Sequence, residues 1–537
     1  MTGQPTTTPK PGQPRAPKRT SAADSVGLAH RPRLWAALSG VASALVVLAV
    51  SEVIALFISP ASSPLFGVGS LVIDLVPGWF KNVVIALFGT NDKIALFVGL
   101  GLLVLVLAVF VGLLEWRRPP WGCLALGVVG GVAVFALVTR ADASPLWAAP
   151  TTVGAAVGIL VLRSLMGRLK AATSGYRAGT RVTRRAFLGF LGGTTVAALA
   201  AGVTARVVNA ATVAVNSVRE ALKLPVPVTP APAIPAVADL GIDGMVPLVT
   251  PNADFYRIDT ALQVPAIDAS KWSLKITGMV EREVSISFDE LLALPLEERV
   301  ITLTCVSNDV GGDLIGNAKW LGYPLRELLK KAGPLAGADM VLSKSVDGYT
   351  ASTPLEALLD EDRFGILAVG MNGEPLPLEH GFPVRMVVAG LYGYVSATKW
   401  VVELEVTRFA DKAAYWTERG WAEQGPIKVA SRIDVPAYLA RVPAGKTPIA
   451  GVAWAQHDGI KGVEVRIDQE EWLPTRLAAD ISIDTWVQWV YDWDAPKGSH
   501  LIEVRATNNT GKTQVNDRLS PFPNGAEGWH QITVEVV

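Results

Sequence analysis

The sequence predicts three parts: an N-terminal helical membrane domain with about five transmembrane helices, an α+β domain, and a C-terminal immunoglobulin-like β-sandwich. Long apolar runs occur only in the first 208 residues. Short strands and helices alternate from about residue 251, and short alternating strands separated by turn signals follow residue 426. With 537 residues, 50% of them hydrophobic and 18% charged, the chain is too long for one domain and unusually apolar for a wholly soluble protein.

Residues 1–33 are polar, basic and rich in Pro and Thr, which predicts a disordered cytoplasmic tail. A nucleic-acid-binding arm is the alternative. The net charge of +0 gives that alternative no support, so we expect no nucleic-acid partner.

Residues 34–208 are predicted to form the membrane domain, because five apolar runs are long enough to cross a bilayer. A sixth segment, Ser59 to Thr90, carries Asp74, Pro77, Gly78 and Lys81 between apolar patches, which favours an interfacial or re-entrant helix. The predicted spans are Leu34–Ile58, Ile94–Leu114, Trp121–Val138, Leu146–Leu162 and Ala186–Val208.

Positive charge predicts the topology of these spans. The basic tail, the pair Arg117/Arg118 and the segment Arg163 to Arg185 all lie inside if five helices cross. The same arrangement places everything after about residue 209 on the extracytoplasmic side of the cell membrane. A sixth span would break this agreement.

A paired-arginine motif precedes the fifth apolar run, Thr183-Arg184-Arg185-Ala186-Phe187-Leu188. It resembles the twin-arginine export signal, which would suit a domain that crosses the membrane already folded around a cofactor. Ordinary positive-inside charge is the alternative. That alternative explains the arginines but not the following Phe-Leu.

The predicted spans contain no histidine, since the five histidines are His30, His380, His457, His500 and His530. A haem between helices usually needs such ligands, so we expect none. The two cysteines, Cys123 and Cys305, are too few for an iron–sulfur cluster. The helices therefore read as an anchor or docking surface.

Residues 209–250 include a Pro-rich stretch, which predicts a semi-rigid linker that holds the soluble part away from the bilayer. The α+β domain is predicted over residues 251–425. Its expected elements are a strand at Trp272–Val280, a helix at Phe288–Leu294, a helix at Leu325–Lys331, a strand at Val341–Ser345, and a hairpin turn at Asn372-Gly373.

Cys305 lies in the stretch Ile301 to Leu325, where an alternating strand-like run meets a loop rich in Gly, Asn and Asp. A thiol at a strand end is well placed to bind a soft metal. From this stretch alone, a small buried hydrophobe is an equal alternative.

Further motifs follow in order: Gly322-Tyr323-Pro324-Leu325, His380-Gly381-Phe382-Pro383-Val384-Arg385, and Tyr392 to Trp400. Together with Cys305 they resemble the sulfite oxidase family of mononuclear molybdenum enzymes, over roughly Pro251 to Val537. In that family a cysteine thiolate binds molybdenum beside the dithiolene of one pterin. The resemblance implies a Mo-molybdopterin cofactor with one pterin per chain.

The resemblance also implies site residues. Cys305 would be the metal ligand, and Arg257 and Asn308 would join it as catalytic residues. Two alternatives stay open: Ser345 could face solvent, and His380 could be a satisfied core histidine. Which of Thr398 and Lys399 makes the contact is also open. The implied cofactor-binding residues are Asp254, Arg257, Ile258, Ser345, His380, Arg385, Ser396, Thr398 and Lys399.

The implied chemistry is two-electron oxygen-atom transfer, of sulfite-oxidase or sulfoxide-reductase type. The substrate stays open. Sulfite oxidases follow the loop asparagine with arginines, whereas Asp309 and Val310 follow Asn308, and Asp313 adds a second acid. Their tyrosine before the Met-Asn-Gly turn is replaced by Val369. An external electron partner, a cytochrome or a quinone-linked membrane protein, is implied because no haem domain is expected.

Residues 426–537 are predicted to form the sandwich, from strands at Gly462–Ile467, Thr485–Tyr491, Leu501–Thr507 and Gln531–Val537. This region resembles the family's dimerisation domain, so a homodimer through it is expected. Five tryptophans could anchor that interface or could simply pack in the sandwich: Trp472, Trp486, Trp489, Trp493 and Trp529.

Two other functions compete with a membrane-anchored oxidoreductase. A metal-free scaffold on the same fold is the first, and Cys305 together with Arg385 argues against it. A transporter with a soluble sensor is the second, and the scarcity of polar residues in the spans argues against that.

Overall fold

In this computed structural model the structure describes residues 31–537 except 59–61, 78–79, 81–83, 85–86, 88–91, 141–142, 174–183, 208–209 and 262–263. The predicted tail, 1–33, and Thr183 of the export motif thus fall almost wholly outside the described residues. The side chains of Arg184 and Arg185 are not described either. Two compact units form, Met1–Val72 with Ile94–Val208, and Ile73–Lys93 with Asn209–Val537.

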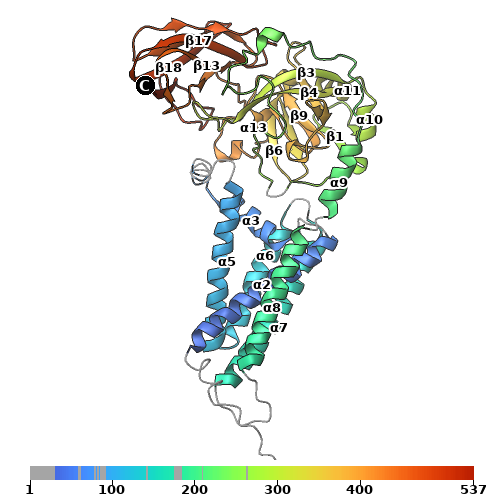
Figure 1. Cartoon of the computed structure of the whole chain (residues 1–537). Coiled ribbons are helices and arrows are strands. Elements are labelled where there is room, and N and C mark those ends of the chain that lie inside the picture. Colours follow the sequence, from blue (N-terminus) through green and yellow to red (C-terminus); the bar gives the residue numbers. More distant parts are fainter. Residues whose placement is uncertain are drawn as a thin grey trace, which may run out of the picture. The chain divides into compact units, whose positions relative to one another are not determined.

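The first unit is a helical bundle in which α2 packs against α7 and α8, and α6 packs against α7 (Figure 1). Small residues allow a close crossing, since a Cβ on Gly40 would lie 2.1 Å from the Ala108 carbonyl oxygen and one on Gly112 2.2 Å from that of Ala36. The helices are α2 (Pro32–Ile58), α3 (Pro64–Leu75), α5 (Asp92–Arg117), α6 (Trp121–Val138), α7 (Ala148–Thr173) and α8 (Arg184–Val207).

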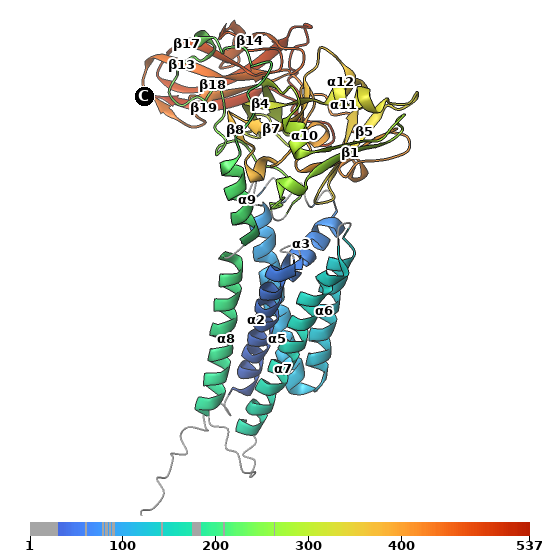
Figure 2. The ribbon, with the colours of Figure 1, turned by 90° about the vertical axis from the view of Figure 1, so that its right-hand side faces the viewer.

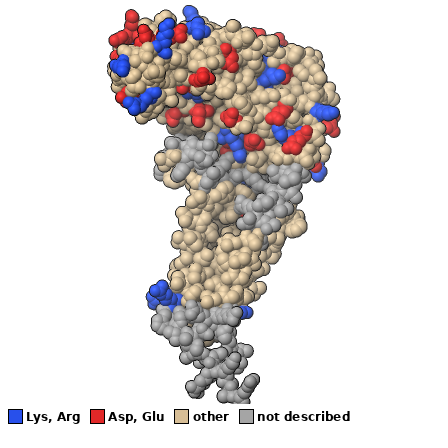
Figure 3. Space-filling view, viewed as in Figure 1, with Lys and Arg blue, Asp and Glu red and all other residues tan. Residues whose placement is uncertain are grey.

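Over the described residues, 4 helices are long and apolar enough to cross a membrane. They are Pro32–Ile58, Ala95–Arg117, Trp121–Val138 and Pro145–Ala171, which match four of the five predicted spans. The fifth prediction coincides with α8, of which only Phe187–Ala200 counts as a shorter apolar helix. Helix α3 is likewise too short to span, in agreement with the interfacial interpretation. On the face seen in Figure 3, most Lys, Arg, Asp and Glu side chains lie on the second unit.

The described part of the second unit contains four sheets, and strands of these sheets are labelled in Figure 2. The first has the order β3-β4-β7-β8 with β9 also paired to β7, and the second has the order β2-β1-β10-β5-β6. Their strands are β1 (Ser273–Gly278), β2 (Val284–Ser287), β3 (Glu297–Thr304), β4 (Ile315–Pro324), β5 (Met340–Ser345), β6 (Thr350–Pro354), β7 (Gly365–Met371), β8 (Glu374–Pro375), β9 (Arg385–Val388) and β10 (Val401–Thr407).

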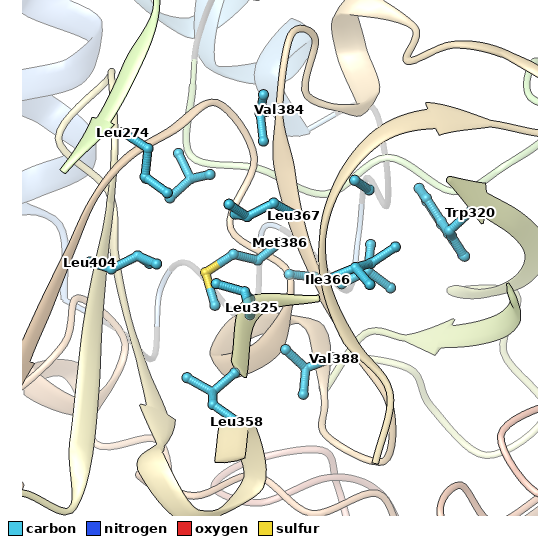
Figure 4. Packing of buried hydrophobic residues seen from close by; sticks show 14 of the residues in the cluster. Leu274, Trp320, Leu325, Leu358, Ile366, Leu367, Val384, Met386, Val388 and Leu404 are labelled. Atoms are coloured by element: carbon cyan, nitrogen blue, oxygen red, sulfur yellow. The ribbon is translucent and has the colours of Figure 1, made fainter. Parts of the chain in front are cut away.

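Short helices cover these sheets, namely α10 (Phe288–Leu292), α11 (Leu325–Ala332), α12 (Leu355–Leu359) and α13 (Gly393–Ser396). One apolar core joins both sheets, with Leu274 and Leu404 from the second facing Ile366 and Met386 from the first (Figure 4). The strand, helix and turn predictions for this domain are confirmed. Asn372 and Gly373 have φ of 52° and 86°, as a tight hairpin turn requires.

Two further sheets share one core after residue 426, so this region is a two-sheet sandwich. Trp489 and Trp493 are buried in this core, and Trp486 is buried in a neighbouring cluster with Leu248 and Ile315. Trp472 and Trp529 are half-buried and meet edge to face, with ring centroids 4.8 Å apart. The strands are β11 (Ala430–Val435), β12 (Arg441–Val442), β13 (Gly445–Trp454), β14 (Ile460–Ile467), β15 (Leu473–Pro474), β16 (Arg476–Leu477), β17 (Val487–Ala495), β18 (Gly498–Asn508) and β19 (His530–Val536).

The Pro-rich part of the predicted linker, residues 224–250, is hydrogen-bonded to the rest of the second unit. The Val228 amide donates to the Leu296 carbonyl at 2.8 Å, and the Leu240 amide to Gln488 Oε1 at 2.8 Å. Trp486 Nε1 donates to the Leu248 carbonyl at 2.9 Å. A Pro-rich chain has few amides of its own, but its carbonyls remain good acceptors, so it can be bound as a strap across both soluble domains.

The predicted linker also begins with a helix, α9 (Ala210–Ala221). Arg219 of α9 donates to the carbonyl oxygens of Leu376 at 2.8 Å and Pro375 at 3.0 Å. The helix is therefore part of the second unit.

Candidate active site around Cys305

Cys305 follows β3 directly and is a buried, free thiol. Its amide donates to the Leu314 carbonyl at 2.9 Å, and its carbonyl accepts the Asn308 amide at 3.1 Å. Burial raises the pKa of the thiol, which a bound metal ion would have to overcome by stabilising the thiolate. Asn308 Oδ1 accepts from the Leu314 amide at 2.9 Å, so this predicted site residue closes the loop that presents Cys305.

Arg385, the first residue of β9, is buried without a carboxylate partner among the described residues. Its three nitrogens donate only to carbonyl oxygens, those of His380 at 3.1 Å and of Met386 and Ala397 at 3.3 Å. The guanidinium lies 5.0 Å from the centre of the Trp320 ring. Burial lowers the pKa of Arg385 to about 10, as expected of a cation that lacks a counter-charge.

Lys399 and Arg257 share one carboxylate. Asp259 Oδ2 accepts from Lys399 Nζ at 2.8 Å and from Arg257 Nε at 3.0 Å. Burial, with a contribution from Arg385, lowers the pKa of Lys399 to about 8, although Asp259 opposes the shift. This pair of cations therefore carries one more positive charge than its carboxylate neutralises.

His380 is buried, and its Nε2 lies 3.1 Å from the Asn252 carbonyl oxygen. Burial, reinforced by the charges of Lys399 and Arg385, lowers the pKa of His380 to about 3. The imidazole is therefore neutral at physiological pH.

These side chains form one electrostatic cluster. Lys399 acts on the Cys305 thiol, and Arg257, Arg385 and Lys399 all act on His380. Three cations against the single carboxylate of Asp259 leave the cluster positive, which suits an anionic ligand such as a phosphate.

Ser345 supplies an independent sign of a ligand, since its hydroxyl is buried and has no hydrogen-bond partner among the described residues. An unpaired buried hydroxyl costs free energy that a bound group would recover. The solvent-facing alternative for Ser345 is therefore wrong.

The other residues predicted to bind the cofactor are either hydrogen-bonded within the protein or more exposed than Cys305 and Arg385. The Ser396 hydroxyl donates to the carbonyl oxygens of Leu391 at 2.9 Å and Tyr392 at 3.1 Å, so it is already used by the backbone just before α13. Thr398 shares a 2.7 Å hydrogen bond with Ser343. Asp254 is exposed and Ile258 is half-buried.

Sequence reasoning missed Tyr256 and Asp259. Tyr256 stacks on Phe255 with ring centroids 5.2 Å apart, and burial, with the charge of Cys305, raises its pKa. Its hydroxyl has no hydrogen bond among the described residues. Both residues flank Arg257, and that adjacency was the available signal.

A metal here would have few protein ligands. Among the described residues, no group of three or more His, Cys, Asp or Glu could hold a metal ion. The donor set thus fits a metal that Cys305 alone binds and whose other ligands belong to an anionic organic cofactor. It does not fit a structural zinc site.

The chain resembles several known proteins. A profile described as the oxidoreductase molybdopterin-binding domain matches residues 261–416. The mitochondrial sulfite oxidase of Mus musculus is 26% identical over 347 residues, which are 54% of this chain and 62% of that protein. The chain therefore spans less than two thirds of that relative's length.

Two bacterial proteins are also similar. The uncharacterized oxidoreductase YuiH of Bacillus subtilis is 33% identical over 158 residues, 29% of this chain and 76% of that protein. The crystal structure of the sulfane dehydrogenase SoxCD from Paracoccus pantotrophus aligns with a TM-score of 0.48 and 22% identity, over 56% of this chain and 83% of that one.

Proposed function

Because the chain belongs to the sulfite oxidase family of molybdopterin-dependent oxidoreductases, we propose that it is a membrane-anchored enzyme of oxygen-atom transfer. The observation that carries this proposal is the lone buried thiol of Cys305 beside a positive cluster in which Arg385 lacks a carboxylate. One pterin cofactor would satisfy both features at once.

The residues divide into roles by their chemistry. Cys305 would bind the metal, and the guanidinium of Arg385 with the ammonium of Lys399 would hold the cofactor phosphate. Ser345 and neutral His380 would hydrogen-bond the pterin. The backbone near Asp254 and Ile258 lies on the same loop as Arg257. When bound, the cofactor supplies a metal centre that exchanges two electrons together with an oxygen atom.

Asp259 and Asn308 position these groups. Asp259 fixes both Lys399 and Arg257, so the two cations face the cofactor from defined directions. Asn308 holds the turn after Cys305, and so orients the thiol. Ser396 contributes through the shape of α13, since its hydroxyl is used internally.

Electrons must be exchanged with an external partner, a cytochrome or a quinone-linked membrane protein. Oxidation of sulfite would take its oxygen from water and release two electrons and two protons. Reduction of a sulfoxide would consume two electrons and two protons and release water. Asp309 and Asp313 disfavour a sulfite dianion.

The proposed location is the cell membrane, with the catalytic domain on the extracytoplasmic side. Five spans, including α8, agree with the positive-inside distribution. The Arg184-Arg185 pair would act as a twin-arginine signal. Replacing both by Lys should leave the soluble unit protected from external protease in intact cells, and unchanged accessibility would argue for ordinary positive-inside charge.

The C-terminal sandwich is proposed to be immunoglobulin-like and to support a homodimer. Trp472 and Trp529 would be the anchors of such an interface, because the other tryptophans of this region are buried in the sandwich. Light scattering of the detergent-solubilised protein tests this, and a monomer at all concentrations would contradict it.

Metal analysis tests the central proposal. The full-length protein, made in a host that supplies the cofactor, should contain about one molybdenum per chain, and Cys305→Ser should contain little and show no turnover. The unfolding transition should change little, since Ser replaces the thiol closely. Wild type that is folded but free of molybdenum would favour the alternative, a metal-free scaffold.

A further inference from the structure

Strand β3, which leads directly into Cys305, is an edge strand of its sheet. Among the named strands it pairs with β4 alone. An edge strand presents a row of N–H and C=O groups that have no partner in the sheet, so it can slip or fray unless another segment covers them. The position of the thiol therefore depends on what covers the open edge of β3.

The strap covers the first half of this edge. The Val228 amide donates to the Leu296 carbonyl at 2.8 Å, and the Glu298 amide donates to the Thr229 carbonyl at 2.8 Å. These bonds join two backbones, as bonds from a neighbouring strand would. They end well before Cys305.

The C-terminal sandwich covers the half of the edge that is nearer to the thiol. The amide of Thr302 donates to the Asp484 carbonyl at 3.0 Å, and the carbonyl of Thr302 accepts from Gln456 Nε2 at 3.1 Å. The Trp486 amide donates to the Thr302 hydroxyl at 2.9 Å. Three residues of the sandwich thus hold one buried residue of the cysteine strand.

Gln456 also reaches the residue that directly precedes the thiol. Its Nε2 lies 3.4 Å from the hydroxyl of Thr304, so one side-chain nitrogen bonds to two positions at the end of β3. His457 braces this contact, because its Nδ1 lies 2.8 Å from Asp484 Oδ1. The two residues that bond to the backbone of Thr302, Gln456 and Asp484, are therefore linked to each other.

The strand also sets the orientation of the Gln456 amide. Gln456 is 3% exposed, and its Oε1 has no hydrogen-bond partner among the described residues. Turning the amide over would bring Oε1 against the Thr302 carbonyl oxygen, and two acceptors cannot bond to each other. A buried oxygen without a partner costs free energy, so the bond to β3 is kept although it destabilises the other end of the amide.

We propose that Gln456 is a positioning residue for the metal site: from the C-terminal sandwich it holds the end of β3, so that Cys305 meets the metal in one fixed place. The inference rests on the proposed function, because only a metal at Cys305 gives this contact a role in catalysis. It assigns the sandwich a second role besides the proposed homodimer. Groups that orient a metal ligand from behind typically change metal affinity 10- to 100-fold.

Gln456→Met tests the proposal, since it removes the donor at nearly constant length. Hydrogen–deuterium exchange of the full-length protein in detergent should show residues 302–308 exchanging about fivefold faster, the factor expected from the loss of one hydrogen bond of about 1 kcal/mol. Residues 487–495, in the core of the sandwich, should exchange at the wild-type rate. Molybdenum should be lost about tenfold faster on dialysis.

Gln488→Met is the matched control. Gln488 is a buried glutamine of the same sandwich, but it bonds to the strap, through the Leu240 amide at 2.8 Å, and not to β3. It should change neither the exchange of residues 302–308 nor the retention of molybdenum. Thr304→Val removes one acceptor of the Gln456 amide from the catalytic side, so it should speed the same exchange about twofold even if Gln456→Met folds poorly.

Unchanged exchange of residues 302–308 in both Gln456→Met and Thr304→Val would overturn the inference. Faster exchange throughout the second unit would do so too, because it would show a purely structural role. So would wild-type retention of molybdenum in a Gln456→Met protein whose cysteine strand exchanges faster. Wild type without molybdenum would refute the proposed function instead, and the exchange rates would still decide whether Gln456 holds the strand.

Discussion

Two buried arginines in the soluble unit have opposite surroundings. Arg432 of the sandwich, 6% exposed, pairs with Asp434 at 2.6 Å and donates to the Gly312 carbonyl. Arg385 of the catalytic domain, 4% exposed, makes its hydrogen bonds to carbonyl oxygens and lies over the Trp320 ring, with no carboxylate partner among the described residues. The first arginine has its counter-charge within the protein, and the second has none among the described residues.

This difference distinguishes a buried charge that serves only the fold from one that can serve a binding site. A buried charge is costly unless it is paired, so a domain that only has to fold pairs its charges internally, as Arg466 does with Glu503 at 2.6 Å. A site that must bind an anion keeps a cation without a partner. The hydroxyl of Ser345 is the uncharged counterpart, since it is buried and has no hydrogen-bond partner among the described residues.

Replacing each arginine by glutamine should have the largest effects, and these should differ between Arg385 and Arg432. Arg385→Gln should lose at least about tenfold in molybdenum content, because one charge-assisted phosphate contact disappears. Its cofactor-free form should be no less stable than wild type, since an unpaired buried cation is removed. Metal analysis and denaturant unfolding measure the two effects.

Arg432→Gln should behave in the opposite way. It leaves Asp434 buried without its partner, at a cost of about 3–5 kcal/mol in the free energy of unfolding. The molybdenum content of the molecules that remain folded should be unchanged. Loss of metal in both variants would show that the two arginines do not differ as described.

Two histidines, His380 and His457, extend the comparison, because each should make the unfolding free energy depend on pH. The pKa of His380 falls from 6.5 to about 3, so the unfolded chain binds the proton more readily. Stability of the cofactor-free protein should therefore fall by a few kcal/mol as pH drops from 6.5 towards 3, and His380→Gln should flatten that decline. Unfolding free energies across this range measure it.

The pKa of His457 is shifted in the opposite direction to that of His380. Its hydrogen bond to Asp484 raises its pKa above 6.5, so its contribution is present below pH 6.5 and disappears as pH rises through the raised pKa. The group is partly exposed, so the effect should be below about 1 kcal/mol. An identical pH profile for His380→Gln and His457→Gln would refute the assignment.

A smaller effect than those of Arg432 and His380 concerns the strap, which belongs to neither region alone. Gln488 accepts from the Leu240 amide at 2.8 Å and donates to the Val246 carbonyl at 3.3 Å. Gln488→Leu should cost about 1–2 kcal/mol in unfolding free energy without loss of molybdenum. Gln531→Leu, at an exposed position of β19, is the control and should stay within about 0.5 kcal/mol.

Local sequence patterns were sufficient to predict many of the helices, strands and turns. The length of four apolar runs gave four helices long enough to span a membrane, and alternation gave β5, β14 and β18. The Asn372-Gly373 pair gave its hairpin. The position of Cys305 at a strand end could also be predicted, because a strand and the loop after it are local features.

Which side chains and backbone groups contact one another could not be predicted, because these contacts join residues that are distant in sequence. The Pro-rich segment has the composition of a spacer, yet Leu296 and Gln488 bind it as a strap. Ser396 has the residue type of a cofactor contact, yet its hydroxyl donates to the backbone carbonyls of Leu391 and Tyr392, just before α13. Asp259 was missed because its role depends on Lys399, 140 residues away.

By itself the sequence determined where the helices, the strands and the candidate metal-binding thiol of Cys305 lie, since apolar periodicity and residue chemistry act over short stretches. Only the tertiary structure decided which charges are neutralised and which are left for a ligand. The energy of a buried charge depends on neighbours that the folded chain brings together, and those neighbours include a carboxylate for Arg432 but none, among the described residues, for Arg385.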